Sequence, residues 1–199
     1  MRIPDRLVIA TRNPGKVMEI ARICRGWPTA WLTFERVSWP EVEEAGASYL
    51  ENALLKAHGV AAAVGEAALA DDSGIEVDAL GGGPGPRSAR FAGEGAGDED
   101  NLRLLIAQLR EIPPAGRTAR YRCVAALALP DGAEAWSEAT CEGRLILEPR
   151  GAGGFGYDPI FVPEGFDRTM AELSPPEKDA ISHRGKAFRA LGEVLGIRG

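Results

Sequence analysis

Two adjacent carboxylates, Asp71 and Asp72, could do chemistry in this sequence, because they stand between an apolar run and a Ser-Gly pair. The apolar run, residues 67–70, predicts the end of a buried strand. Side chains of neighbouring residues in an extended segment point to opposite faces, so we expect the two acids to have different roles. Acids that follow a strand can hold Mg²⁺ against a phosphate or orient a water molecule. The same residue types also form solvated turns, and the stretch alone leaves this alternative open.

A polar segment at residues 11–16 follows a short buried strand predicted at residues 7–10. Apolar residues then recur from Val17 at the i, i+3, i+4, i+7 spacing of a helix, so the segment leads from a strand into a helix N-terminus. Free backbone N–H groups at such an end favour an anion, and Lys16 adds a mobile positive charge. The spacing of a Walker A phosphate loop is absent. An ordinary helix cap with an incidental lysine accounts for the segment equally well.

Three acids within residues 41–44 precede a helix that we expect to begin after Ser48, with Glu51 as its capping-box partner. Acids before a helix interact favourably with its positive end, which can by itself explain their presence. Asn52 and Lys56 are four residues apart and therefore share one face of this helix, from which both could reach the same ligand. Their spacing alone favours a solvated pair over a shared ligand.

Two glycine-rich segments have the composition of ligand-binding loops. Residues 81–86 lead into a segment that carries Arg87 and Arg90, which is typical of a phosphate loop and also of a flexible connector. Residues 151–159 combine glycines, which let a ligand approach the backbone closely, with two aromatic residues whose rings could stack on a base. A hairpin turn with core aromatics is the alternative for this second segment.

Basic and titratable groups gather at residues 178–186, at the start of the last predicted helix. Ser182 can cap this helix, which places His183 and Arg184 in its first turn, where positive charges oppose the helix dipole. An anionic ligand explains this placement better than stability does.

The remaining pattern supplies the elements that must position these residues. Further strands are expected at residues 30–34 and 75–80, and Asp98 is expected to cap an amphipathic helix. Residues 120–129 and 135–147 predict a long hairpin. Because both faces of its first strand are apolar, we expect that strand to lie in a central sheet.

The composition fits a globular protein of one domain or two closely packed lobes, with 199 residues of which 45% are hydrophobic. A formal net charge of −6 argues against binding to nucleic acid or to acidic membranes, although a local positive cluster or a metal would still allow a polyphosphate ligand. Three cysteines far apart in apolar surroundings predict buried free thiols. The first apolar run is too short for a signal peptide or a membrane span, so we expect a cytoplasmic protein.

Five motifs stand in order along the chain: Thr-Arg-Asn-Pro-Gly-Lys at 11–16, Glu-Glu-Ala-Gly at 43–46 with Glu-Asn-Ala at 51–53, Asp-Asp-Ser-Gly at 71–74, Gly-Phe-Gly-Tyr-Asp-Pro at 154–159 and Ser-His-Arg-Gly-Lys at 182–186. Their order and spacing closely resemble the inosine triphosphate pyrophosphatases, also called house-cleaning nucleotidases. The resemblance covers residues 7–195, and the combination of motifs is highly specific. Arg12 and Pro14 occupy positions of the first motif that are variable, so every side chain that carries the resemblance is still present.

The resemblance implies an α/β fold with a long mixed central sheet, whose flanking helices form two lobes around an active-site cleft within a single domain, residues 1–199. It implies that inosine, deoxyinosine or xanthosine triphosphate (ITP, dITP, XTP) is hydrolysed to the monophosphate and pyrophosphate with Mg²⁺, usually by a homodimer. Asp72 would accept a proton and bind the metal together with Glu43. The residues that would bind substrate are Thr11, Arg12, Asn13, Pro14, Gly15, Lys16, Ser73, Phe155, Gly156, Tyr157, Asp158, Lys178, His183 and Arg184. Additional candidates are Asn52, Lys56, Asp71 and Arg90. For such substrates, His183 and Arg184 could select the oxygen that these purines carry at C6, because histidine can donate one hydrogen bond and arginine only donates.

Two other functions remain open from the sequence. A pyrophosphatase for other modified nucleotides would carry similar motifs. A nucleotide-binding module without turnover would keep the loops and the basic cluster but would not need the acid pair, because two carboxylates beside a polyphosphate are costly unless a metal lies between them.

Overall fold

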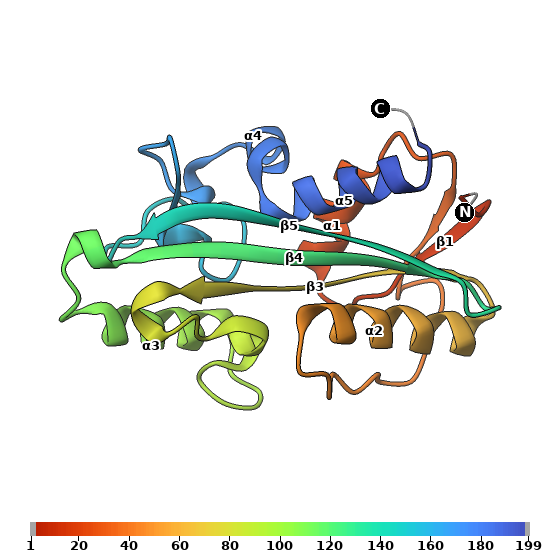
Figure 1. Ribbon diagram of the computed structural model, residues 1–199, viewed down its shortest axis with the longest axis horizontal. Helices are drawn as coiled ribbons and strands as arrows, with labels where there is room; N and C mark the ends of the chain where they lie inside the picture. Colours follow the sequence, from red (N-terminus) through yellow and green to blue (C-terminus); the bar gives the residue numbers. More distant parts are fainter. Residues whose placement is uncertain (1–2, 198–199) are drawn as a thin grey trace. The chain divides into compact units, whose positions relative to one another are not determined.

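The computed structural model describes residues 3–197, and its strands form a mixed six-stranded sheet (Figure 1). The strands are β1 (Arg6–Ile9), β2 (Ala30–Leu32), β3 (Ala67–Val77), β4 (Thr118–Ala128), β5 (Glu134–Leu145) and β6 (Phe161–Pro163). Their order in the sheet is β2-β1-β3-β4-β5-β6. β1 pairs in parallel with β2 and β3, whereas β5 and β6 are antiparallel. The mixed sheet, the hairpin of β4 and β5, and the central place of β4 are confirmed.

The α-helices of residues 3–197 are α1 (Pro14–Ile23), α2 (Tyr49–Val64), α3 (Asp98–Leu109), α4 (Pro175–Ile181) and α5 (His183–Val194). Ser48 caps α2 as predicted, because its hydroxyl accepts a hydrogen bond from the Glu51 N–H at 3.2 Å. The Glu51 carboxylate binds the N–H of Ala47 at 2.6 Å, one residue before the position that a capping box requires. None of these helices has the length and apolar content that crossing a membrane requires.

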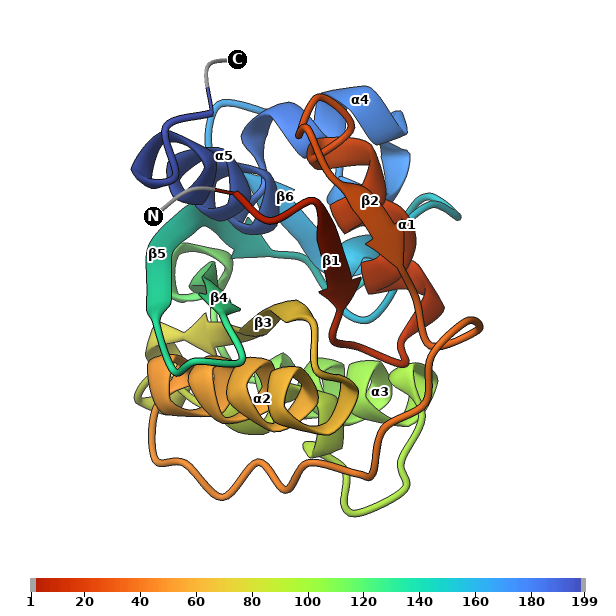
Figure 2. The same ribbon diagram turned by 90° about the vertical axis from the view of Figure 1, so that its right-hand side faces the viewer.

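The chain forms two compact units, and unit 1 holds residues 3–72, Cys123–Ala139 and residues 184–197. Along the strands of unit 1, side chains alternate between two apolar clusters. One cluster packs against α1 and α5 and the other against α2, so these helices cover opposite faces of the strands (Figure 2). Two consecutive strand residues in this unit therefore meet different helices.

Unit 2 holds Ser73–Arg122 and Thr140–His183. Its core gathers Leu105 and Leu109 of α3 with inward-facing residues of the neighbouring strands and of a short 3₁₀ turn, Asp158–Ile160. All three cysteines of the chain are buried free thiols, as predicted. The single two-lobed domain expected from the resemblance stays a prediction.

Several predicted boundaries need correction. β3 is one continuous strand, so the turn expected at residues 71–74 and the separate strand expected after it are wrong. β2 ends at Leu32, before the expected position 34. Gly97 takes the N-cap position of α3, and Asp98 is the first residue of that helix. Because β3 continues without interruption, Asp71 and Asp72 alternate across it, which confirms their expected opposite orientation.

Candidate active site

Asp72, the predicted proton acceptor, is buried on the side of β3 that faces α2. Its Oδ2 accepts a hydrogen bond from Asn52 Nδ2 at 3.2 Å, and its Oδ1 accepts one from Lys56 Nζ at 3.1 Å. The solvated pair that spacing favoured for Asn52 and Lys56 is therefore wrong, since both side chains turn inward to one carboxylate. Two donors on different oxygens fix the orientation of that carboxylate.

A second carboxylate, Glu44, shares the same ammonium group, because Lys56 Nζ lies 3.2 Å from Glu44 Oε1. Burial raises the pKa of Asp72, and Glu44 adds to this rise against the opposing effects of Lys56 and Lys16. Burial alone would lower the pKa of Lys56, but Asp72, Asp71 and Glu44 raise it. Two acids around one lysine leave negative charge in excess, which an added cation would offset.

This pair of acids suits a hard cation. Asp72 and Glu44 both place an oxygen within 3.2 Å of one cationic atom, Lys56 Nζ. Mg²⁺ is commonly bound by one or two carboxylates and keeps several waters. Among residues 3–197, no cluster of three or more His, Cys, Asp or Glu side chains could hold a metal. The residues present therefore fit Mg²⁺ held by a carboxylate pair, the waters and the substrate.

Asp71 faces the opposite side of β3, toward α1 and α5. Its Oδ2 lies 3.0 Å from Arg184 Nη2 and 3.1 Å from Lys16 Nζ. Arg184 also donates from Nη1 to Glu19 Oε2 at 2.6 Å. Burial alone would raise the pKa of Asp71, but Lys16, Arg184 and Lys56 hold it well below its usual value. Asp71 therefore stays ionised and anchors two basic side chains.

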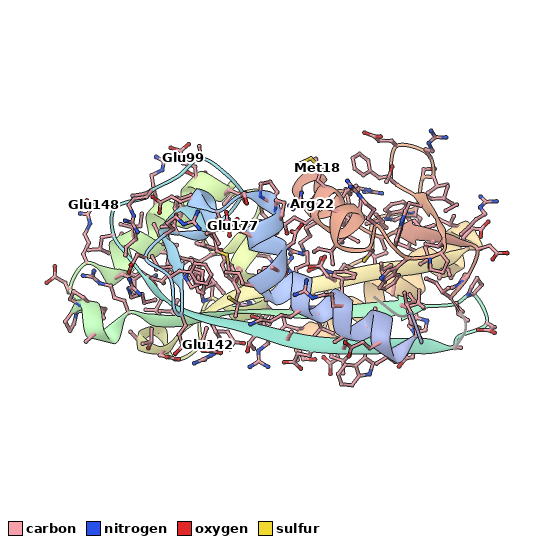
Figure 3. All side chains as sticks on the ribbon, turned by 90° about the horizontal axis from the view of Figure 1, so that it is seen from above. Met18, Arg22, Glu99, Glu142, Glu148 and Glu177 are labelled. Carbon is pink, nitrogen blue, oxygen red and sulfur yellow. The ribbon has the colours of Figure 1, made fainter. Side chains whose placement is uncertain are left out.

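The charge of Arg184 is compensated inside the protein, which corrects the argument that an anionic ligand explains its place in the first turn of α5 better than stability does. Asp71 and Glu19 bind its guanidinium, and all three residues are buried. Glu19 faces inward from α1, whereas Met18 beside it is 63% exposed on the outer side of the helix, as is visible in Figure 3. Sequence reasoning missed Glu19 because its partner lies 165 residues away.

The N-terminal loop is the cap of α1. Asn13 Oδ1 accepts a hydrogen bond from the Lys16 N–H, and Thr11 Oγ1 accepts one from the Asn13 N–H, both at 3.2 Å. Pro14 and Gly15 open the first turn of the helix. The cap is confirmed, but the lysine of that alternative is not incidental, because it pairs with buried Asp71. Lys16 Nζ pairs with Asp71 Oδ2 at 3.1 Å, and the phosphate-binding role of the loop stays a prediction.

Two other predicted site residues, Arg12 and Glu43, have exposed side chains. Arg12 donates to the backbone carbonyl of Trp39, and its guanidinium lies 5.8 Å from the centre of the Trp39 ring. Glu43 is exposed, whereas Glu44 next to it is the acid that contacts Lys56. The metal role of Glu43 stays a prediction, and the geometry adds Glu44, which the motif comparison did not single out.

In unit 2, Asp158 is the centre of a buried network. Its Oδ2 accepts hydrogen bonds from Lys178 Nζ at 2.5 Å and from the Phe155 N–H at 2.9 Å. Its Oδ1 accepts one from the Tyr121 hydroxyl at 3.3 Å. Lys178 Nζ also lies 5.1 Å from the centre of the Phe155 ring, within cation–π range. Asp158 therefore holds two other predicted substrate-binding residues in place.

The loop that carries Phe155 is fixed by its backbone. Gly154 has a φ of +71°, and a Cβ there would lie 2.0 Å from Asp158 Oδ2, so only glycine fits. The Gly156 N–H donates to Asp98 Oδ2 at 2.9 Å. This loop is therefore an ordered segment with a defined conformation.

The two aromatic residues of this loop have different surroundings. Tyr157 is buried, and its hydroxyl donates to the Ser88 carbonyl at 2.7 Å. Phe155 is partly exposed beside Lys178. The core alternative is therefore confirmed for Tyr157, while the stacking role of Phe155 stays a prediction.

The other predicted residues of unit 2 lie on three elements. His183, at the start of α5, is buried with its ring stacked on Tyr121, the centroids 4.5 Å apart and the planes 10° apart. Ser73 continues β3 and is half-buried. Arg90 ends the 3₁₀ turn Gly85–Arg90 and is also half-buried.

Comparison with known proteins places this geometry in a family. Residues 7–194 match the model of the Ham1 family. The chain is 52% identical over 196 residues to the dITP/XTP pyrophosphatase of Streptomyces avermitilis, with 96% of each chain covered. It is 45% identical over 197 residues to the dITP/XTP pyrophosphatase of Bacillus subtilis, with 98% of this chain and 99% of that protein covered.

Solved structures agree with the sequence relatives. A HAM1 protein from Coxiella burnetii superposes with a TM-score of 0.86 at 38% identity, covering 97% of this chain and 99% of that one. A nucleoside-triphosphatase / dITP/XTP pyrophosphatase from Mycobacterium abscessus gives a TM-score of 0.74 at 45% identity, covering 94% and 98%. The match over nearly the whole chain, together with the resemblance of the motifs, shows that this protein belongs to the Ham1 family.

Proposed function

We propose that the protein is a pyrophosphatase for deaminated purine nucleoside triphosphates, which converts dITP, ITP and XTP to the monophosphate and pyrophosphate. Two relatives that span nearly its whole length, at 52% and 45% identity, are named dITP/XTP pyrophosphatases. The geometric observation that carries the proposal is the buried Asp72, held by Asn52 and Lys56 beside the second carboxylate of Glu44. A nucleotide-binding module without turnover has no need of such an acid cluster.

Asp72 would accept the proton of the attacking water. Its pKa is raised by burial, which makes the carboxylate a stronger base than an exposed aspartate. Asn52 and Lys56 hold its two oxygens in a fixed plane, so the base is oriented before substrate binds. The bond that breaks joins the α- and β-phosphates, and pyrophosphate leaves.

Mg²⁺ is the cofactor we propose, with Asp72 and either Glu43 or Glu44 as carboxylate ligands. The excess negative charge around Lys56 supports a divalent cation at this place. The ion would supply partial neutralisation of the triphosphate charge and of the charge that develops on the leaving group.

The positive groups and the aromatic groups would bind different parts of the substrate. Lys16, at the N-terminus of α1, and Lys178 would bind phosphate oxygens. Phe155 would offer its partly exposed ring to the purine, and His183 would donate a hydrogen bond to the base. Arg184 stays a predicted base contact, and its two carboxylate partners give it a supporting role as well.

The proposal is tested by measuring pyrophosphate release from XTP, dITP, ITP, GTP and ATP, with Mg²⁺ and with a chelator. We expect Mg²⁺-dependent release from the first three and turnover at least about 100-fold lower in Asp72→Asn, because the base is lost. Asp78→Asn is the matched control, since it removes an exposed acid that pairs with Arg120, and its turnover should be unchanged. Wild-type turnover in Asp72→Asn contradicts the role of Asp72, and XTP binding without hydrolysis favours the binding module.

The homodimer and the cytoplasmic location expected from the sequence remain predictions. Light scattering on the purified protein measures the first, and microscopy of a tagged chain in its own cells measures the second.

A further inference from the structure

Tyr121 contacts two separate parts of the predicted substrate-binding group in unit 2. Its ring lies nearly parallel to the imidazole of His183, with centroids 4.5 Å apart and planes 10° apart. Its hydroxyl donates to Asp158 Oδ1 at 3.3 Å. The side chain comes from β4 and is buried, so its position is set by the sheet.

The hydroxyl of Tyr121 acts on residues that it does not touch. Asp158 Oδ2 already accepts hydrogen bonds from Lys178 Nζ and from the Phe155 N–H. A contact to Oδ1 fixes the rotation of the carboxylate about its terminal bond, and so fixes the direction in which Oδ2 receives both donors. The charge-assisted bond to Lys178, at 2.5 Å, is the shorter and stronger of these contacts.

The ring of Tyr121 orients His183 directly. Offset-stacked aromatic pairs favour one relative orientation, and His183 is too buried to turn without displacing the tyrosine. Phe161 of β6 packs against Tyr121 with ring centroids 4.6 Å apart, which limits the freedom of the tyrosine itself. The imidazole therefore stacks on a ring that the core holds in place.

We propose that Tyr121 is a positioning residue for nucleotide binding, which sets the imidazole of His183 through its ring and the Lys178–Asp158–Phe155 group through its hydroxyl. This inference rests on the proposed function, because it takes His183, Lys178 and Phe155 as substrate contacts. Its consequence is that Tyr121 acts on substrate affinity and leaves the chemical step, which Asp72 carries, unchanged.

The test compares Tyr121→Phe, which keeps the ring and removes the hydroxyl, with Tyr121→Leu, which removes both. KM and kcat are measured with XTP and Mg²⁺, and the Kd of XTP is measured by calorimetry in a chelator. The hydroxyl contact is long for an O–H···O bond, so we expect KM and Kd to rise about threefold in Tyr121→Phe and about tenfold or more in Tyr121→Leu. The kcat should stay within about twofold in both variants.

Two controls separate positioning from a general loss of packing. Leu109→Ala removes a buried side chain of α3 from the same apolar cluster and should lower stability without changing KM. Tyr49→Phe removes the hydroxyl of a tyrosine that, like Tyr121, is 7% exposed, and should change neither constant. If Leu109→Ala raises KM as much as Tyr121→Leu does, the effect is loosened packing and the proposal is wrong.

A spectroscopic readout tests the stacking without catalysis. The chain has two histidines, so a His58→Gln variant assigns the imidazole signals of His183 in a proton–carbon NMR spectrum. We expect the ring current of Tyr121 to displace these signals, with the displacement kept in Tyr121→Phe and lost in Tyr121→Leu. Equal His183 shifts in wild type and Tyr121→Leu, or an unchanged Kd in Tyr121→Leu, overturn the proposal. A wild-type protein that binds XTP but releases no pyrophosphate contradicts the proposed enzyme instead, and Kd and the His183 shifts still decide the role of Tyr121.

Discussion

Replacing Arg184 by methionine should destabilise the protein strongly, because it leaves two buried carboxylates without their shared partner. Arg184 donates to Asp71 Oδ2 from two nitrogens, at 3.2 and 3.0 Å, and to Glu19 Oε2 at 2.6 Å. Breaking a buried ion pair by removing one partner costs about 3–5 kcal/mol, since the remaining charge is uncompensated. With a urea m-value of about 2.5 kcal/mol/M, a loss of about 4 kcal/mol lowers the unfolding midpoint by about 1.6 M.

Urea denaturation followed by circular dichroism measures this shift, and two further variants interpret it. Glu19→Gln combined with Arg184→Met should be less destabilised than the sum of the single changes by about 1–3 kcal/mol, because the two groups interact directly. Arg103→Met is the matched control, since Arg103 also contacts two acids but is exposed on α3, and its loss should cost less than about 0.5 kcal/mol.

The kcat/KM values for ITP and ATP, measured on the same samples, separate the two roles of Arg184. An Arg184→Met variant whose unfolding midpoint equals that of the wild type, and whose ratio of kcat/KM for ITP to that for ATP falls, would refute the structural reasoning. It would show that the guanidinium serves the base and contributes nothing to holding the two acids.

Two predictions concern pH. Arg168 and Ser174 lower the pKa of Glu177 to about 2. The cap that Glu177 gives α4 should therefore be complete above the usual glutamate pKa of about 4.3 and lost as the pH falls through 2. An NMR titration of the Glu177 carboxyl group with its midpoint near 4.3 would contradict this. Burial raises the pKa of the Cys24 thiol, so the contribution of Cys24 to the free energy of unfolding should be constant up to the unfolded thiol pKa of about 8.5 and fall as the pH rises further. Reaction with a thiol reagent at pH 8 should require unfolding, and fast labelling of Cys24 in the folded protein would show that this thiol is accessible.

Local signals in the sequence were sufficient for the parts of the fold that depend on neighbouring residues. The cap at Ser48, the start of α5 at His183 and the opposite orientation of Asp71 and Asp72 all follow from spacing within a few residues. α4 was not predicted, although Pro175 and Pro176 stand in its first turn, where proline is well tolerated, and Ser174 caps it.

The site needed contacts that no local pattern encodes. Glu19 and Arg184 are 165 residues apart, and Tyr121 and Asp158 are 37 apart. Asn52 and Lys56 resembled solvated surface residues because their common partner, Asp72, lies on a strand that packs against their helix. Only the complete fold brings these groups together and buries Asp72 among them, and this burial is the main cause of the rise in its pKa.

The uninterrupted path of β3 through Asp71 and Asp72 also limits where this chain can tolerate insertions and deletions. One residue added between Leu69 and Asp71 would exchange the faces of the two acids, so that the carboxylate meeting Lys56 would turn to Arg184 and the other would turn to α2. Both the anchor and the proposed base would be lost in one event, although every side chain would still be present. Residues 33–40, which form no helix or strand and precede the acids at 41–44, can change length without such an exchange. Natural length variation in this part of the chain should therefore be confined to segments like residues 33–40, and β3 should keep a fixed length.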